Sequence, residues 1–225
     1  LKVMKAITRF TVHSILVMFF LTLFYSCNKE SGITETAAVS PGYSALQSQI
    51  NAIPPAALSE TELNNLKWMR EEEKLARDVY LALYAKWRIT VFNNIASSEQ
   101  SHMDALLLLL KKYDIADPAS PVAGVFNNPD LQALYYQLVE NGSISIAKAY
   151  ETGATIEDLD LLDLKNAMLV NDNEDIRLVY ESLMKGSRNH LRSFYKNLLN
   201  AGFTYQAVYI TQPELEAIII SAMET

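Results

Sequence analysis

The sequence predicts an all-α protein built from four long helices, with a long, partly helical crossover between the second and the third. Half of the 225 residues are hydrophobic and only 20% are charged, so the chain can bury a sizeable core. Glycine and proline, which interrupt helices, number only 7 each. Apolar residues also recur at spacings of three and four over several long stretches, which is the periodicity of helices with one buried face.

The first 26 residues have the pattern of a targeting signal. Three basic residues precede an apolar run at 14–25, which is too short to span a membrane comfortably as a mature helix. Cys27 follows, and the segment FYSC resembles a bacterial lipobox, with Phe24 where leucine is usual. The resemblance implies that Cys27 carries a lipid and anchors the protein in the bacterial cell envelope, on the periplasmic or surface side. An ordinary cleaved signal peptide is the alternative.

The charge of the chain bears on its partners. Removal of residues 1–26 takes the formal net charge from −7 to −10, because it deletes three basic groups and no acidic ones. Such a surface repels nucleic acid, so we expect no nucleic-acid partner. Residues 27–43 are small and polar after the cysteine, and we expect them to be a flexible tether that links a lipid anchor in the membrane to the domain.

Capping and turn residues place the ends of the helices in the first half of the domain. A short helix is expected over 44–53. The first long helix begins after Ser59, which opens a capping box. The β-branched stretch 88–91 separates it from a second long helix over 92–113. Prolines and glycines then mark a long crossover at 114–154.

The second half of the domain is expected to form another helical hairpin. Two short helices are predicted inside the crossover, near 129–140 and 144–152, separated by an Asn-Gly pair. The third long helix follows Thr155, which opens a Thr-x-x-Asp capping pattern, and ends near Leu169. The fourth runs from about 174 to 199 and stops at an Asn-Ala-Gly sequence.

These elements define one helical domain over residues 44–225. The core of the bundle covers about 58–200, and residues 203–225 form a C-terminal extension. The extension begins with the irregular segment FTYQAVYI and ends in a short helix that opens at Pro213, because proline is favoured in the first turn of a helix.

Carboxylate and imidazole side chains occur at comparable positions on the four long helices. Glu73 lies within the apolar face of the first helix. Glu99 and His102 share one face of the second, because residues three apart lie on the same side of a helix. Glu157 on the third and His190 on the fourth complete the set. In ferritin-like bundles that hold two metal ions, Glu and Glu-x-x-His groups point inward in this way, so the sequence predicts a metal site.

The positions of the turns support this set. In an antiparallel hairpin, side chains at one level lie equally far from the turn. The midpoint between Glu73 and the pair at 99 and 102 falls near residue 87, at the first expected turn. The midpoint between Glu157 and His190 falls within 171–175, at the second. Both hairpins therefore bring their candidate ligands to one level. Glu72, the neighbour of Glu73, is an alternative ligand on the first helix.

Short motifs around these residues resemble those of a known superfamily. The sequence EKLARDVY at 73–80 resembles the first-helix motif of rubrerythrin-type proteins. With Glu99-x-x-His102 and Arg188-Asn-His190, the chain resembles a bacterial ferritin-like domain family of unknown function over roughly residues 58–200. The resemblance implies a ferritin-like four-helix bundle with two iron ions, and the oxygen and nitrogen ligands also suit manganese or zinc.

One position departs from that pattern. Ser187 stands three residues before His190, where a carboxylate is expected. Asp160, one turn after Glu157, faces the same side, and rubrerythrin-like sites carry a second acidic residue there. We therefore expect Asp160 to supply the missing oxygen. The predicted metal ligands are Glu73, Glu99, His102, Glu157, Asp160 and His190.

The resemblance implies an oxidoreductase of the ferroxidase or peroxidase type, in which two iron ions accept electrons from Fe(II) or another reductant and reduce O2 or peroxide. Cys27 is the only cysteine, so the rubredoxin-type iron centre of full rubrerythrins is absent. Two alternatives stay open. One is a non-catalytic envelope interaction module in which Ser187 marks a degenerate site, and the other is a structural or single-metal site. A homodimer is compatible with the sequence, which leaves the oligomeric state open.

Overall fold

The computed structural model describes residues 41–225, and every regular element in this range is helical. The predicted signal segment, 1–26, and Cys27 lie outside the described residues. The predicted tether, 27–43, extends into this range, but α1 begins at Pro41, so the last three residues of the tether are already helical. None of the helices in this part of the chain is long and apolar enough to cross a membrane. The helices are α1 (Pro41–Ala52), α2 (Glu60–Trp87), α3 (Thr90–Lys112), α4 (Pro129–Gly142), α5 (Ile146–Leu169), α6 (Glu174–Asn200) and α7 (Gln212–Ile220).

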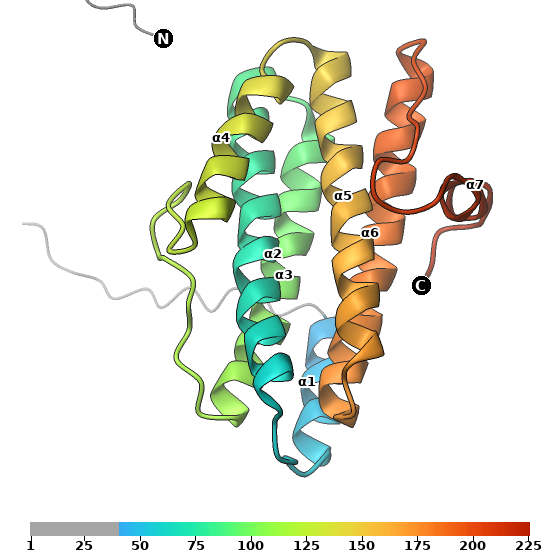
Figure 1. Cartoon of the computed structure of the whole chain (residues 1–225). Helices are drawn as coiled ribbons and strands as arrows, with labels where there is room; N and C mark the ends of the chain where they lie inside the picture. Colours follow the sequence, from blue (N-terminus) through green and yellow to red (C-terminus); the bar gives the residue numbers. More distant parts are fainter. Residues whose placement is uncertain (1–40) are drawn as a thin grey trace, which may run out of the picture. The chain divides into compact units, whose positions relative to one another are not determined.

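Four long helices, α2, α3, α5 and α6, lie side by side (Figure 1). α2 packs mainly against α3, and α5 packs mainly against α6. The two pairs meet because α2 also contacts α5 and α3 also contacts α6. α1 packs against α3 and α6, α4 packs against α2 and α5, and α7 packs against α6. The structure therefore confirms the all-helical class and arranges the long helices as two hairpins.

The predicted caps and turns define both hairpins. Ser59 caps α2 through a capping box, in which its backbone N–H donates to Glu62 at 2.8 Å and its hydroxyl accepts from the Glu62 backbone at 3.2 Å. Arg88 has a left-handed backbone (φ 56°) that ends α2, and α3 starts two residues later. The second turn covers 170–173, between α5 and α6. Both turns lie where the sequence predicts them.

One predicted boundary is wrong. The expected short helix at 144–152 and the expected third long helix are one continuous helix, α5, capped by Ser145. Thr155 does not cap a helix, because its hydroxyl donates to the backbone carbonyl one turn earlier at 2.8 Å. Gly153 does not break the helix either. Its missing side chain leaves room for the ring of Phe194, since a Cβ there would lie 2.6 Å from that ring.

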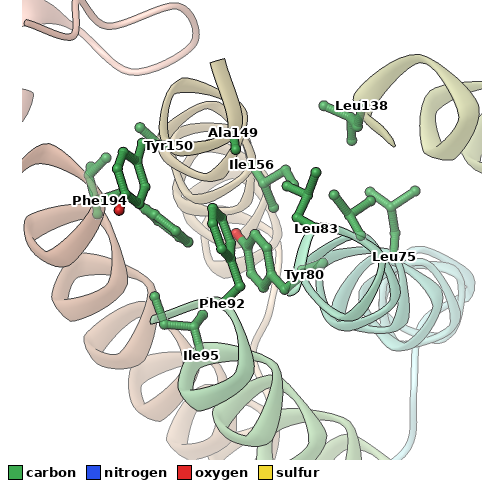
Figure 2. Packing of buried hydrophobic residues seen from close by; sticks show 14 of the residues in the cluster. Leu75, Tyr80, Leu83, Phe92, Ile95, Leu138, Ala149, Tyr150, Ile156 and Phe194 are labelled. Carbon is green, nitrogen blue, oxygen red and sulfur yellow. The ribbon is translucent and has the colours of Figure 1, made fainter. Parts of the chain in front are cut away.

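Apolar side chains form two buried clusters in the interior. The first core includes Tyr80, Phe92, Tyr150 and Phe194, which come from four different helices and meet as a group of rings (Figure 2). The centroids of Tyr80 and Phe194 are 5.3 Å apart, and Phe92 stacks on Tyr150 at 5.7 Å. Such aromatic pairs add about 0.5–1.5 kcal/mol beyond the area they bury. The second core, which includes Leu66, Leu106, Leu164 and Tyr180, lies toward the other ends of the same helices.

A layer of buried polar residues separates the two cores. On α2 the second core ends at Met69 and the first core begins at Leu75, and the buried Glu72 and Glu73 lie between them. α3 and α6 show the same arrangement. Because an isolated charge is costly to bury, such a layer must be held together by mutual pairing or by bound cations.

Other charges of α2 attach the crossover to the helices. The Lys74 side chain is fully buried, and it donates to the backbone carbonyls of Val122 at 3.0 Å and Val125 at 3.1 Å. It also pairs with Asp78 at 2.5 Å, and Asp78 accepts from the backbone N–H of Gly124 at 2.9 Å. The buried pair of Lys74 and Asp78 therefore fixes the first half of the crossover to α2, together with the ion pair between Arg70 and Asp117.

Candidate metal centre

Two groups of three metal-binding side chains meet in the polar layer. The first triad consists of Glu73, Glu99 and His102, and the second triad consists of Glu99, Glu157 and His190. Within each triad one donor atom of every residue lies within 4.8 Å of the others. All five residues are buried, with exposed fractions of 2–8%. Five of the six predicted ligands therefore converge, and they come from α2, α3, α5 and α6.

Glu99 occupies the centre because its two oxygens face different histidines. Its Oε2 lies 2.8 Å from Nδ1 of His102, and its Oε1 lies 2.9 Å from Nδ1 of His190. The other side of each imidazole nitrogen faces a second carboxylate. Nδ1 of His102 is 3.1 Å from Oε2 of Glu73, and Nδ1 of His190 is 3.3 Å from Oε2 of Glu157. The two rings stack with centroids 5.6 Å apart.

Several of these buried donor atoms lack a hydrogen bond. Oε1 of Glu99 and Nδ1 of His190 are only 2.9 Å apart, but neither has a hydrogen-bond partner in the described part of the chain. Oε1 of Glu73 and Oδ1 of Asp160 are also without a partner there. Buried polar atoms are normally hydrogen-bonded, and an unmet one is costly. Coordination to a cation would satisfy all of them, so this donor set fits a metal centre.

Burial and mutual interaction shift the acidity of these groups. Burial and the nearby Glu99 raise the pKa of Glu157 to about 7, although His190 opposes the shift. Burial also raises the pKa of Glu73 to about 7, although His102 lowers it. Burial lowers the pKa of His190, but Glu99 and Glu157 outweigh this effect and raise it to about 10. Burial is the largest cause of both carboxyl shifts, and the neighbouring Glu99 adds to them.

Neighbouring residues hold the ligands in place from outside. The Tyr80 hydroxyl donates to Oε1 of Glu157 at 2.5 Å. Nε2 of His190 lies 2.9 Å from the Ser98 hydroxyl, which leaves its Nδ1 directed at the carboxylates. Such bonds to the far nitrogen of a histidine fix the orientation of a metal ligand. Sequence reasoning treated Tyr80 as a core residue, although its position seven residues after Glu73 puts both on one helical face.

Gly186 makes room for His102. A Cβ at Gly186 would lie 2.3 Å from Nε2 of His102, so no other residue fits without movement of the ring. No pattern in the sequence indicates this role, because the two residues belong to different helices and the fit depends on how closely α3 approaches α6.

Asp160 belongs to neither triad. It is buried, with 7% of its surface exposed, and its Oδ2 accepts a hydrogen bond from the Ser187 hydroxyl. Burial, Glu73 and Glu157 raise its pKa well above the usual range, so its carboxylate interacts with those of the triads. The structure thus brings Asp160 to the position of the missing fourth-helix carboxylate, and its ligation stays a prediction.

Glu72, the alternative to Glu73, belongs to neither triad. Its carboxylate is buried with Oε2 unpartnered in the described part of the chain, and burial together with Asp160 and Asp163 raises its pKa well above the usual range. Glu73 is the residue that reaches His102. The sequence could not separate these two neighbours, because both lie on the broad buried side of α2.

A cavity of about 260 Å³ lies between α1, α3 and α6 and reaches His102. Its polar lining consists of hydroxyls, the His102 imidazole and one ammonium group, and none of the described residues that line it is a carboxylate. The lining residues are Tyr43, Leu46, Ser98, Ser101, His102, Ala105, Ser182, Leu183, Lys185 and Gly186.

The fold and this cluster define a class: an all-helical protein with carboxylates and imidazoles gathered between its long helices. Residues 62–222 match the family model described as "Uncharacterized protein domain (DUF2202)", so the chain belongs to this family. The match includes α7, which makes the C-terminal extension part of the family domain.

Two comparisons align more than three quarters of this chain with a relative. The "Uncharacterized protein MJ0754" of Methanocaldococcus jannaschii is 53% identical over 176 residues, which cover 78% of this chain and 95% of the relative. A crystal structure of the hypothetical protein MJ0754 from Methanococcus jannaschii has a TM-score of 0.76 at 54% identity. The structural match covers 76% of this chain and 99% of the chain in that crystal structure.

Proposed function

We propose that this protein is a ferritin-like metal-binding protein that holds two iron ions and oxidises Fe(II) or reduces O2 or peroxide. The observation that carries the proposal is the shared position of Glu99, whose two oxygens face the Nδ1 atoms of His102 and His190 at 2.8 and 2.9 Å. A carboxylate between two histidines is the arrangement that a bridging ligand of two metal ions requires. The two hairpins, α2 with α3 and α5 with α6, support a ferritin-like four-helix bundle.

The ligands divide between two metal positions. Glu73, Glu99 and His102 would hold the first ion, and Glu99, Glu157 and His190 would hold the second. With Asp160, four carboxylates contribute four negative charges, which two divalent cations balance while the imidazoles stay neutral. Carboxylate oxygen with imidazole nitrogen suits iron or manganese, and zinc is the redox-inactive alternative. Iron at this site would supply the electron transfer to O2 or peroxide.

The surrounding residues prepare the site for this chemistry. The two apolar cores exclude water on both sides of the polar layer, which strengthens every electrostatic interaction within it. Tyr80 and Ser98 fix the orientations of Glu157 and His190. The cavity beside His102 gives a small molecule a route to the first triad between α3 and α6.

The location in the cell envelope is a separate part of the proposal. It rests on the sequence of residues 1–27, where Cys27 would carry the lipid that anchors the chain to a membrane. Labelling with a radioactive fatty acid tests it. The natural chain should incorporate label, and Cys27→Ala should not. Label in both chains, or in neither, would contradict the lipoprotein assignment.

Anaerobic loading with Fe(II) followed by metal analysis tests the metal centre. We expect two ions per chain, and we expect exposure to O2 or peroxide to oxidise them. Glu99→Ala should lose both ions and His102→Ala should lose one, whereas Glu181→Gln, which removes an exposed ion pair with Arg177 on α6, should keep both. A wild-type protein without metal would favour the non-catalytic module, and one tightly bound ion without oxidation would favour a structural site.

A further inference from the structure

We propose that the C-terminal segment, residues 203–225, is a brace that positions Glu157 and His190, so that the second metal position depends on this segment and the first does not. This inference rests on the proposed function, because it assumes that the two triads bind metal ions. It assigns a role to Asp158 and Glu224, two acidic residues outside the triads. Both act as positioning residues, since neither donates an atom to a triad.

The first attachment of the brace is next to Glu157. Asp158 is fully buried, and its Oδ2 accepts from the Tyr205 hydroxyl at 2.7 Å and from the backbone N–H of Val208 at 2.6 Å. The backbone N–H of Tyr209 also donates to Oδ2, at 3.2 Å, and that of Ile210 donates to Oδ1 at 2.7 Å. Both oxygens of one carboxylate are thus bound by the brace.

The second attachment surrounds His190. Arg188 binds the Glu224 carboxylate through two bonds of 2.7 and 2.5 Å, and Arg192 binds it at 2.9 Å. Asn189 donates to the backbone carbonyl of Glu224 at 2.9 Å and accepts from its backbone N–H at 2.9 Å. Paired bonds between a guanidinium and a carboxylate fix direction as well as distance. Residues on both sides of His190 are therefore tied to the end of the chain.

Helix geometry transmits this restraint to the triad. Successive residues of a helix are rotated by about 100°, so a residue next to an inward ligand points away from the site. Asp158 is held from outside while its neighbour Glu157 faces the site, and the same holds for the residues that flank His190. A shift of either helix at these levels would move a ligand of the second triad. Bonds outside the ligand shell commonly set metal affinity by about 10- to 100-fold.

The first triad lacks this support. Glu73 and His102 belong to α2 and α3, whereas α7 packs on α6 and pairs with α5 through Glu214 and Lys165. The brace itself is firmly seated, because Tyr205, Ile210 and Leu215 are buried in the first core. The restraint on Glu157 and His190 therefore comes from an ordered part of the domain.

Calorimetric titration of the full chain with Zn²⁺ tests the brace, because zinc is redox-inactive and binding is then measured without turnover. The wild type should bind two ions. Asp158→Asn and, separately, Glu224→Gln should weaken one of the two ions by about 10- to 100-fold and leave the other unchanged. Glu224→Gln keeps the test informative if Asp158→Asn fails to fold, since Glu224 is partly exposed.

Two matched controls separate positioning from general destabilisation. Asp175→Asn removes another buried carboxylate, which binds the Tyr113 hydroxyl at 2.8 Å in the first turn of α6, away from the triads. Glu181→Gln removes another carboxylate that pairs with an arginine of α6. Both controls should keep two ions at wild-type affinity. Equal weakening of both ions in the brace variants, or no weakening, would overturn the inference.

Hydrogen exchange of the metal-free chain gives a second readout. Asp158→Asn and Glu224→Gln should speed exchange in peptides covering 153–161 and 186–193, and should not change peptides covering 95–105. If the wild type binds no zinc, the proposed function fails, and exchange alone then decides the brace. Faster exchange in all three regions, or in none, would refute it.

Discussion

The Ser187 hydroxyl of α6 donates a hydrogen bond to Oδ2 of Asp160 on α5, at the place where the proposed ferritin-like pattern has a carboxylate on α6. Both residues are buried between the helices. The second oxygen of Asp160 has no hydrogen-bond partner in the described part of the chain, so it is available as a metal ligand.

Ser187→Ala should reduce the stability of the metal-free protein by about 1–3 kcal/mol, because it leaves a buried carboxylate without its donor. Urea unfolding of the metal-free protein measures this. Ser193→Ala is the control, since its hydroxyl only donates to a backbone carbonyl on the same helix, at 3.0 Å. An unchanged stability in Ser187→Ala would show that the hydrogen bond to Asp160 does not stabilise the fold.

Gly186→Ala should displace His102 and weaken the metal bound by the first triad, because the new Cβ would lie 2.3 Å from Nε2 of that ring. Alanine improves helix propensity by about 1 kcal/mol, so any net loss of stability reports the collision. Thermal unfolding and zinc titration together measure both effects. Glu181→Ala on the exposed side of α6 is the control, and a Gly186→Ala protein that binds two ions normally would contradict the close fit.

Glu99→Gln should reduce the number of bound metal ions more than Glu73→Gln does. The first substitution removes a carboxylate that both triads share, so both ions should be lost or weakened by at least about 10-fold, whereas the second affects one triad only. Metal analysis after zinc loading and desalting measures the stoichiometry. Loss of a single ion in both variants would show that Glu99 does not bridge two positions.

Glu62→Gln should reduce the stability of the protein at neutral pH. It should also make the stability less sensitive to a fall in pH below about 4.5. Burial raises the pKa of Glu62, but hydrogen bonds from Asn173, Ser59 and Asp172 outweigh this effect and lower it to about 2. Because the folded pKa is depressed, the stabilisation is complete above about pH 4.5 and is lost as the pH falls from about 4.5 to 2.

Urea unfolding between pH 2 and 7 measures this effect. The wild type should lose stability more steeply than Glu62→Gln below pH 4.5, and the two curves should converge near pH 2. Glu60→Gln, at an exposed position in the same first turn, is the control. Parallel curves for wild type and Glu62→Gln would refute the depressed pKa.

Lys74→Met should destabilise the fold by about 1–3 kcal/mol, because it removes one of the two cations that pair with the buried Asp78 and leaves only Arg77. It should also loosen the crossover, since Lys74 binds two of its carbonyls. Urea unfolding and proteolysis within 114–128 measure these effects. Lys86→Met, at an exposed position near the end of α2, should change neither, and a stable, protease-resistant Lys74→Met would contradict the anchoring role.

Local signals in the sequence were sufficient to predict most helix ends. The Ser59 cap and the breaks near 88 and 171 predict ends that the structure confirms, because caps and turns depend on residues close in the chain. The Thr155 cap is wrong, since the same residue pattern can form an internal hydrogen bond when neighbouring helices favour continued helix. The local sequence pattern also could not show which of Glu72 and Glu73 reaches His102.

The sequence by itself determined an all-helical chain, two hairpins with their turns, and five ligand candidates at matching levels, because helix periodicity and turn position are local properties. Only the tertiary structure decided that Glu99 faces both histidines and that Gly186 leaves room for His102. It also decided that Ser187 binds Asp160 and that the C-terminal segment binds Asp158. These contacts join residues on different helices, and their distances depend on how the helices pack against one another.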